Sequence, residues 1–113
     1  MRRVILESPY QGGLFRRWRN VRFARACLRD CLMRGEAPIA SHLLYTQPGV
    51  LRDDIEDERQ LGIEAGHAWI ASADVMVVYL RNGGAVTPGM NSSIKRAKAI
   101  GIPVEFRRLE VDQ

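Results

Sequence analysis

The sequence predicts a single α/β domain, residues 1–113, in which helices cover both faces of a parallel sheet of about four to five strands. Short apolar runs alternate with longer helical patterns in the order β-α-β-α-β-α-β. Residues 75–80, VMVVYL, form a continuous apolar run of the kind found in a strand that is buried on both faces. Connections of helical length between such strands favour parallel pairing and right-handed crossovers.

Local signals place the individual elements. Thr87 is an N-cap residue, Pro88 fits the first helical position, and Gly101 with Pro103 ends the helix that begins there. Gly35 ends an earlier helix, and an acidic connection at 46–55 is a plausible lid. The expected strands lie at 4–6, 75–80 and 104–107, and residues 38–45 supply a further strand with its exit loop. The expected helices run from about 18 or 20 to 33, from about 57 to 71, and from Pro88 to Gly101.

Each helix carries apolar residues at helical spacing, which we expect to face the core. Cys27 and Cys31 lie four apart on the first helix without clustered histidines, so they are expected to be small core residues. The expected inward residues are Val21, Ala24, Leu28, Cys31 and Leu32 on the first helix, Leu61, Ala65, Ala68 and Trp69 on the second, and Met90, Ile94 and Ala97 on the third.

The composition is ordinary for a globular protein, with 46% hydrophobic and 27% charged residues. No apolar run approaches the ~20 residues that span a bilayer, and the N-terminus lacks a signal-peptide core. We therefore expect a cytoplasmic protein without a membrane partner, in the host cytoplasm if it is viral. No Walker loop, GxGxxG, CxxC or HExxH pattern occurs, so we expect neither a cofactor nor a metal site.

The net charge of +4 is distributed unevenly. Seven arginines lie between residues 16 and 34 against one aspartate, whereas six acidic residues lie between 53 and 64 against one arginine. This pattern favours a phosphate-bearing ligand near the basic side or self-association of basic with acidic surfaces, and a solvated helix face is an equally open interpretation.

Ligands of open α/β sheets bind outside the carboxyl ends of the strands. Ser8 follows the first strand there, and His42, a packed residue or a functional one, lies near the end of the second. The candidates for acid, base or nucleophile near strand ends are Glu7, Tyr10, His42, Glu64, Asp74, Ser92 and Ser93.

The segment 73–103 forms a second part of this expected site. A strand, a glycine-rich turn and a helix N-terminus bring free amides and the positive end of the helix dipole together, which favours an anion. Arg22 and Arg25 would add charge-assisted contacts if they face the cleft. The groups around the helix N-terminus are Thr87, the amides of Gly89 and Met90, Ser92 and Ser93.

These residues carry a resemblance to a known family. Ala73-Asp74-Val75-Met76-Val77-Val78, Thr87-Pro88-Gly89-Met90 and Ile94-Lys95-Arg96-Ala97 through Gly101-Ile102-Pro103-Val104 resemble the nucleoside 2-deoxyribosyltransferase superfamily, especially its small, often phage-encoded, uncharacterised branch. Ser8-Pro9-Tyr10 is similar to the family's opening loop, which contacts base and sugar. The resemblance covers nearly the whole chain. It implies a three-layer flavodoxin- or Rossmann-like fold, homo-oligomers with sites near subunit contacts, and cleavage of an N-glycosidic bond.

The resemblance also implies two catalytic carboxylates that this chain lacks. The family's glutamate, which attacks the anomeric carbon, falls on Ser93 when counted back from Ala97. The family's aspartate falls near Gly66, where Glu64 or His67 would replace it only with a backbone shift. A serine hydroxyl does not stabilise or trap an oxocarbenium-like centre as a carboxylate does.

We therefore expect a nucleoside- or nucleotide-binding domain without the family's chemistry, and consider a role as a sponge for a nucleotide signal in host defence. Two alternatives stay open: an active N-glycosidase or deoxyribosyltransferase whose carboxylate is Glu7, Glu64 or Asp74, and a nucleic-acid or protein interaction module that uses the arginine-rich helix. The expected ligand-binding residues are Ser8, Pro9, Tyr10, Gln11, Gly12, Arg22, Arg25, His42, Thr87, Gly89, Met90, Ser92 and Ser93.

Overall fold

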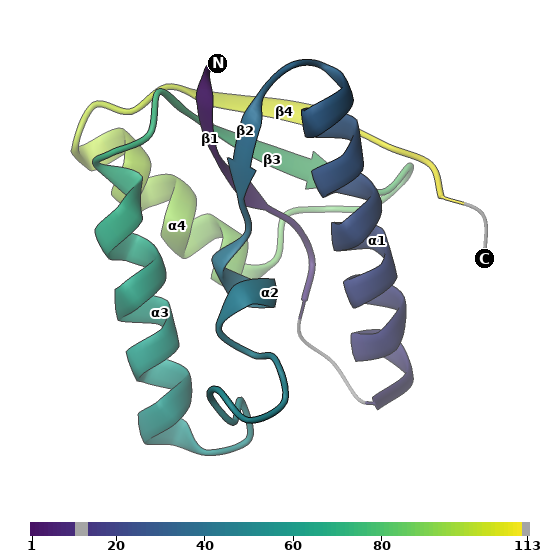
Figure 1. Ribbon diagram of the computed structural model, residues 1–113, viewed down its shortest axis with the longest axis vertical. Coiled ribbons are helices and arrows are strands. Elements are labelled where there is room, and N and C mark those ends of the chain that lie inside the picture. The colour runs from purple at the N-terminus through teal and green to yellow at the C-terminus, as the bar shows by residue number, and fades with distance from the viewer. Residues whose placement is uncertain (11–13, 112–113) are drawn as a thin grey trace.

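The computed structural model describes residues 1–10 and 14–111. Within them the sheet has the strand order β2-β1-β3-β4, and every neighbouring pair is parallel. This confirms the predicted α/β fold (Figure 1). The strands are β1 (Arg3–Glu7), β2 (Ala37–Ile39), β3 (Val75–Leu80) and β4 (Val104–Arg108), and the helices are α1 (Leu14–Met33), α2 (Ser41–Leu44), α3 (Glu56–Ile70) and α4 (Pro88–Ala99).

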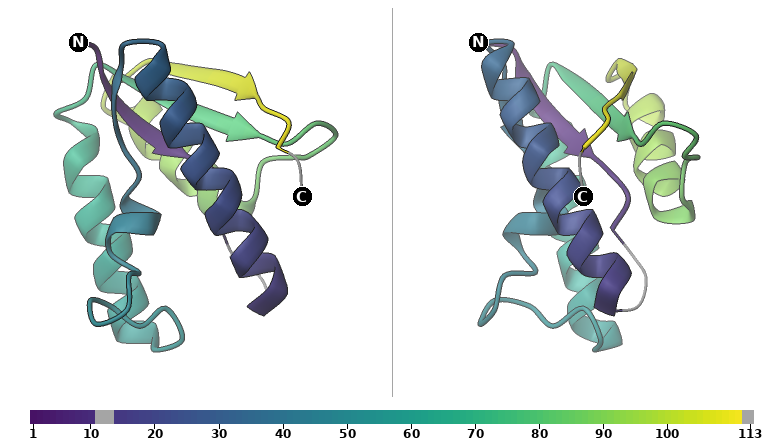
Figure 2. Two further views of the ribbon diagram at one scale, coloured as in Figure 1. Left: turned by 45° about the vertical axis from the view of Figure 1, so that its right-hand side comes forward. Right: turned by 90° about the vertical axis from the view of Figure 1, so that its right-hand side faces the viewer.

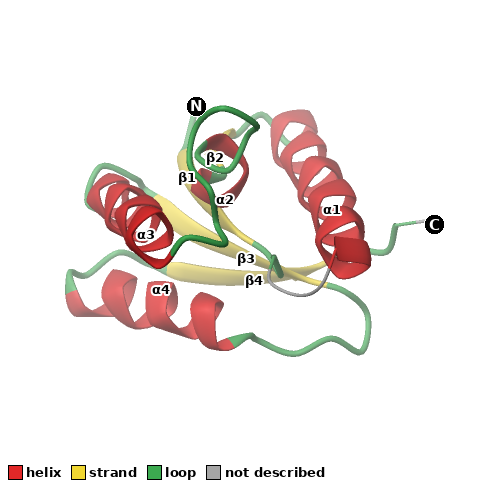
Figure 3. Ribbon diagram, turned by 90° about the horizontal axis from the view of Figure 1, so that it is seen from below, coloured by secondary structure: helices red, strands yellow, loops and turns green. Residues whose placement is uncertain are grey.

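Helices cover both faces of the sheet and create two apolar layers. α1 lies on one face, and α3 and α4 lie on the other (Figures 2 and 3). Side chains alternate along a strand, so Leu6 and Val77 pack with Phe23 of α1, whereas Met76 and Val78 pack on the opposite side. All six residues of β3 are buried, as the continuous apolar run predicts.

The predicted start and inward face of α4 are confirmed. Thr87 caps the helix, because its side-chain oxygen accepts a hydrogen bond from the backbone N–H of Met90 at 3.2 Å, and Pro88 is the first helical residue. Met90, Ile94 and Ala97 are all buried against the sheet.

The predicted inward face of α3 is wrong. Leu61 is 55% exposed and Trp69 46% exposed, and Ala68 is also exposed. The residues that α3 buries are Gly66 and Ile70. Residues at helical spacing form two possible inward faces on α3. Contacts with the sheet and with α2 bury the face that carries Gly66. An apolar stripe of Leu61, Ala65, Ala68 and Trp69 therefore runs along the outer side of α3; we call it the outer α3 stripe.

Smaller corrections concern α1 and β2. α1 begins at Leu14, earlier than predicted. Leu32, predicted to face inward, is 55% exposed, because Phe23 and Cys27 provide the contact of α1 with the sheet. Cys27 and Cys31 are buried as free thiols, in agreement with the expected core position. β2 ends at Ile39, because the residues after it form the helical turn α2.

The carboxyl ends of β1 and β2 meet at one edge of the sheet, near the N-termini of α2 and α4 (Figure 1). Asp74 lies at the opposite edge, where it accepts a hydrogen bond from the backbone N–H of Arg3 at 2.7 Å and forms an ion pair with the Arg3 side chain at 3.2 Å. Among the described residues, no helix is both long and apolar enough to cross a membrane.

Candidate functional site

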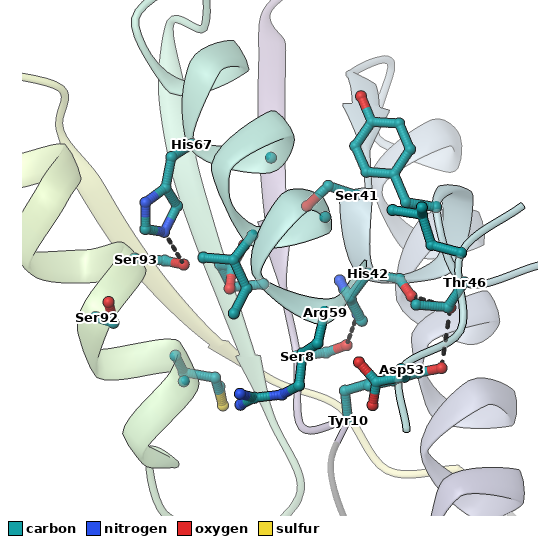
Figure 4. A pocket seen from close by; sticks show the side chains of 18 of the residues that line it. Ser8, Tyr10, Ser41, His42, Thr46, Asp53, Arg59, His67, Ser92 and Ser93 are labelled. Atoms are coloured by element: carbon teal, nitrogen blue, oxygen red, sulfur yellow. Dashed lines mark hydrogen bonds between the residues drawn. The ribbon is translucent and has the colours of Figure 1, made fainter. Parts of the chain in front are cut away.

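A cavity of about 160 Å³ opens at the edge of the sheet where β1 and β2 end. Its walls come from the end of β1, α2 and the connection after it, α3, and the first turns of α4 (Figure 4). The structure thus brings together residues that are more than 80 positions apart in the sequence. The predicted site residues that line the cavity are Glu7, Ser8, Tyr10, His42, Thr87, Gly89, Met90, Ser92 and Ser93.

Other predicted site residues lie elsewhere. Glu64 and Arg22 are exposed, and Arg22 stacks over the Trp18 ring at 5.0 Å. Arg25 lines a separate groove between α1 and the β2–α2 segment. Asp74 occupies the opposite edge of the sheet, and Pro9 follows Ser8 without lining the cavity. Gln11 and Gly12 lie outside the described residues.

Glu7, Ser93 and His67 form a polar row from β1 through α4 to α3. The Ser93 hydroxyl is close enough to the Glu7 carboxyl to stabilise its charged form, and Ser93 Oγ lies 3.5 Å from His67 Nε2. Burial raises the pKa of the Glu7 carboxyl to about 7, because the enclosed site disfavours the charged form more than Ser93 stabilises it. Burial also lowers the pKa of His67. This row therefore combines a histidine whose neutral form is favoured with a carboxyl whose pKa lies near neutral pH.

A second polar group lies on the other side of the cavity. Ser8 Oγ is 2.8 Å from His42 Nε2, and the Tyr10 hydroxyl donates a hydrogen bond to Thr46 Oγ1 at 2.9 Å. The Thr46 hydroxyl in turn donates to the His42 carbonyl. Burial lowers the pKa of His42 to about 4, so the ring is neutral at pH 7. A neutral imidazole has one donor and one acceptor nitrogen, which suits recognition of a polar uncharged group.

Charged side chains belong to the part of the cavity formed by α3 and the preceding connection. Asp53, Glu58 and Arg59 line it, and Figure 4 shows Asp53 and Arg59 on the same side as Ser8 and Tyr10. Arg17 of α1 approaches Asp53 at 3.7 Å. Sequence reasoning missed these residues. Arg59 is the one basic residue in an acidic stretch, but that pattern does not show which way its side chain points.

Gly66 allows α3 to approach α2 closely. A Cβ atom at this position would lie 2.6 Å from Ser41 Oγ and 3.1 Å from Ser41 Cβ. The position where the resemblance implies an aspartate therefore has little room for any side chain. His67, the next residue, lines the cavity instead. Within residues 1–10 and 14–111, no cluster of His, Cys, Asp and Glu is arranged to hold a metal ion.

Comparison with known proteins agrees with this architecture. A family model described as "Domain of unknown function (DUF7768)" matches residues 2–107. The chain belongs to this family. No curated protein matches the chain in sequence. The chain is similar to a solved structure of the 2-deoxyribosyltransferase from the psychrotolerant bacterium Bacillus psychrosaccharolyticus, with a TM-score of 0.65 and 17% sequence identity. The match covers 98% of this chain and 75% of that chain.

This structural likeness shows the fold that the DUF7768 chain shares with the transferase. It agrees with the α/β fold that the sequence predicts. At 17% identity the likeness extends to the fold alone, so the residues in the cavity must support any functional conclusion.

The close approach at Gly66 gives a first prediction. Gly66→Leu will lower the free energy of unfolding by about 1–3 kcal/mol, because the added atoms displace α2 and narrow the cavity. Urea denaturation measures this change. Gln60→Leu, on the exposed surface of the same helix, is the control and is expected to change stability by less than about 0.5 kcal/mol. Equal stability of Gly66→Leu and the wild type would contradict the proposed contact.

Proposed function

We propose that the cavity binds a nucleoside or nucleotide, and that the chain does not cleave the glycosidic bond. The observation that carries this proposal is the cavity at the carboxyl edge of a parallel sheet, with a hydroxyl, Ser93, where the resemblance implies an attacking carboxylate. The fold shared with a 2-deoxyribosyltransferase supports the choice of ligand class.

The lining matches the two chemical halves of a nucleoside. Ile63, Ile70 and Met90 offer apolar contacts for a flat ring, and hydroxyl and imidazole groups offer hydrogen bonds for a sugar or for the polar edge of a base. Ser92 and Thr87 lie at the start of α4, where backbone amides and the helix dipole favour the phosphate of a nucleotide. A ligand of this class therefore satisfies both the apolar and the polar parts of the wall.

The substitution at position 93 supports binding without turnover. An oxocarbenium-like transition state needs an adjacent negative charge or a carboxylate that traps it covalently. An unactivated serine hydroxyl supplies neither, so transition-state stabilisation is lost while contacts with the ground state remain. A cytoplasmic protein that binds a nucleotide signal without consuming it lowers the free concentration of that signal. We propose this sponge role, of use to a phage against host defence.

We also propose that the protein is a homo-oligomer that associates through the outer α3 stripe. Leu61 and Trp69 expose about half of their surfaces, which is costly for large apolar side chains gathered on one helix. The Trp69 indole N–H donates a hydrogen bond to the Tyr45 hydroxyl at 2.9 Å, and Tyr45 lines the cavity. A contact on this stripe would therefore lie beside the ligand site.

One observation favours a second function, an active N-glycosidase. The carboxyl of Glu7 reaches Ser93 from the neighbouring strand, so the cavity contains a carboxyl even though α4 does not supply it. A carboxyl with a pKa of about 7 is suited to general acid catalysis at neutral pH.

Ligand binding is tested by thermal unfolding in the presence of deoxynucleosides, their monophosphates and cyclic nucleotides. A ligand at about 100 times its Kd stabilises the native state by about 2.7 kcal/mol and raises Tm. In Gly89→Phe this increase will disappear, because the new ring fills the cavity from a position whose Cβ meets no atom within 4 Å. Asn91→Phe, exposed on the same helix, is the control and keeps the increase. Absence of any ligand-dependent shift would refute the proposal.

Base release separates the two functions. Chromatography of deoxynucleosides incubated with the wild-type protein is expected to show no free base above the level without protein. Release of base that Glu7→Ala abolishes would establish the glycosidase instead. Release that persists in Glu7→Ala but is lost in Glu64→Ala would place the carboxylate on α3.

Oligomeric state is tested by sedimentation. The wild type is expected to sediment as a dimer or larger species, and Leu61→Arg as a monomer, because a charge in the outer α3 stripe opposes burial. Gln60→Arg, on the same helix but outside the stripe, is expected to leave the assembly intact. A monomeric wild type at high protein concentration would rule out this interface.

A further inference from the structure

Glu7 is a carboxyl that the sheet places in the cavity, and the described residues include no cationic partner for it. It ends β1 opposite Val78 of β3, and the hydroxyl of Ser93 is its polar neighbour in the cavity. Among the described residues, the ion pairs join other carboxyls to arginines and do not include Glu7. An enclosed carboxylate without a cation is costly, whereas an enclosed carboxylic acid is not.

The surrounding elements supply little positive charge to stabilise the ionised form. On α3 and α2 the two histidines are neutral at pH 7, because burial lowers the pKa of both. α4 contributes hydroxyls to this wall, and the charge of its Arg96 lowers the pKa of His67. Arg59 shares its part of the cavity with two acidic residues. The other titratable groups that line the cavity are Tyr10, His42, Tyr45, Asp53, Glu58, Arg59 and His67.

We propose that Glu7 holds the ligand as a neutral carboxylic acid, donating its O–H to an acceptor atom such as a carbonyl oxygen or ring nitrogen of a base. This inference rests on the proposed nucleoside or nucleotide site and names the group that recognises the ligand there. Loss of the Glu7 proton removes the donor and places a negative charge against the acceptor, so affinity falls. The pKa of Glu7, raised by burial to about 7, places this change at neutral pH.

If Glu7 instead met the ligand as a carboxylate, the pH dependence of affinity would have the opposite sign. A carboxylate at Glu7 would accept hydrogen bonds from the hydroxyls of a sugar, and affinity would then rise with pH as the carboxyl ionises. The direction of the pH dependence therefore shows which form of Glu7 meets the ligand. The Glu7→Gln substitution also distinguishes the neutral from the ionised carboxyl, because the glutamine amide keeps a donor and an acceptor in nearly the same shape but cannot ionise.

Calorimetry with 2′-deoxyadenosine and thymidine between about pH 5.5 and 8.5 provides the test, since neither probe titrates in that range. Wild-type affinity is expected to fall about tenfold per pH unit above about pH 7. Glu7→Gln is expected to bind with an affinity that does not change with pH and that is close to the wild-type value at low pH. Glu7→Ala is expected to bind at least about tenfold more weakly at pH 6. Asp57→Asn, at an exposed carboxyl of α3 outside the cavity, keeps the wild-type profile.

A flat or rising affinity of the wild type with pH would overturn this inference and leave the proposed function standing. Absence of binding of either probe at every pH would overturn both. Thermal unfolding against pH gives an independent readout of Glu7. Its raised pKa contributes stability that is present below the unfolded-state value of about 4.5 and is lost as pH rises through about 7. The Tm of the wild type will therefore fall relative to that of Glu7→Gln across this range, and parallel curves would contradict a neutral Glu7.

Discussion

The register between β1 and β3 determines what the cavity contains. Leu6 pairs with Val77 and Glu7 with Val78, in the middle of a strand that is buried along its whole length. Because side chains alternate between the two faces, Leu6 joins the layer under α1 and Glu7 points to the side of α3 and α4. A shift of one residue would exchange these faces and place the carboxyl among apolar residues under α1. Complete burial of β3 fixes this register and thereby places Glu7 in the cavity.

Two glutamates illustrate how the same side chain acquires opposite properties in this fold. Glu36 accepts hydrogen bonds from both terminal nitrogens of Arg107, at 2.7 and 2.8 Å, and these bonds lower its pKa to about 2. Glu7 meets a hydroxyl, and burial raises its pKa to about 7. Asp74 resembles Glu36, since Arg3 neutralises it at the edge away from the cavity. Arginine therefore favours the ionised form of Glu36 and Asp74, whereas burial favours the neutral form of Glu7 in the cavity.

The shared fold and the different lining explain why likeness to a transferase does not settle the activity. The parallel sheet belongs to the fold that this chain shares with the transferase. The chemistry of such a fold depends on a few side chains, and here a serine stands at 93 and a glycine at 66. Ser41 leaves no space for a larger residue at 66. These two positions, and not the shared fold, support our proposal that the cavity binds its ligand without cleaving it.

Elements with local signals could be predicted from the amino-acid sequence. The apolar run of β3, and the Thr-Pro cap and apolar stripe of α4, depend on residues within one or two turns of each other, so their positions follow from pattern alone. Contacts between distant segments select the buried face of α3, bring Glu7 to the cavity, and leave Glu64 in solvent and Asp74 at the far edge. The charge pattern of the sequence likewise did not show that Arg59 lines the cavity. These outcomes depend on contacts between segments tens of residues apart, and periodicity along one helix carries no information about its neighbours.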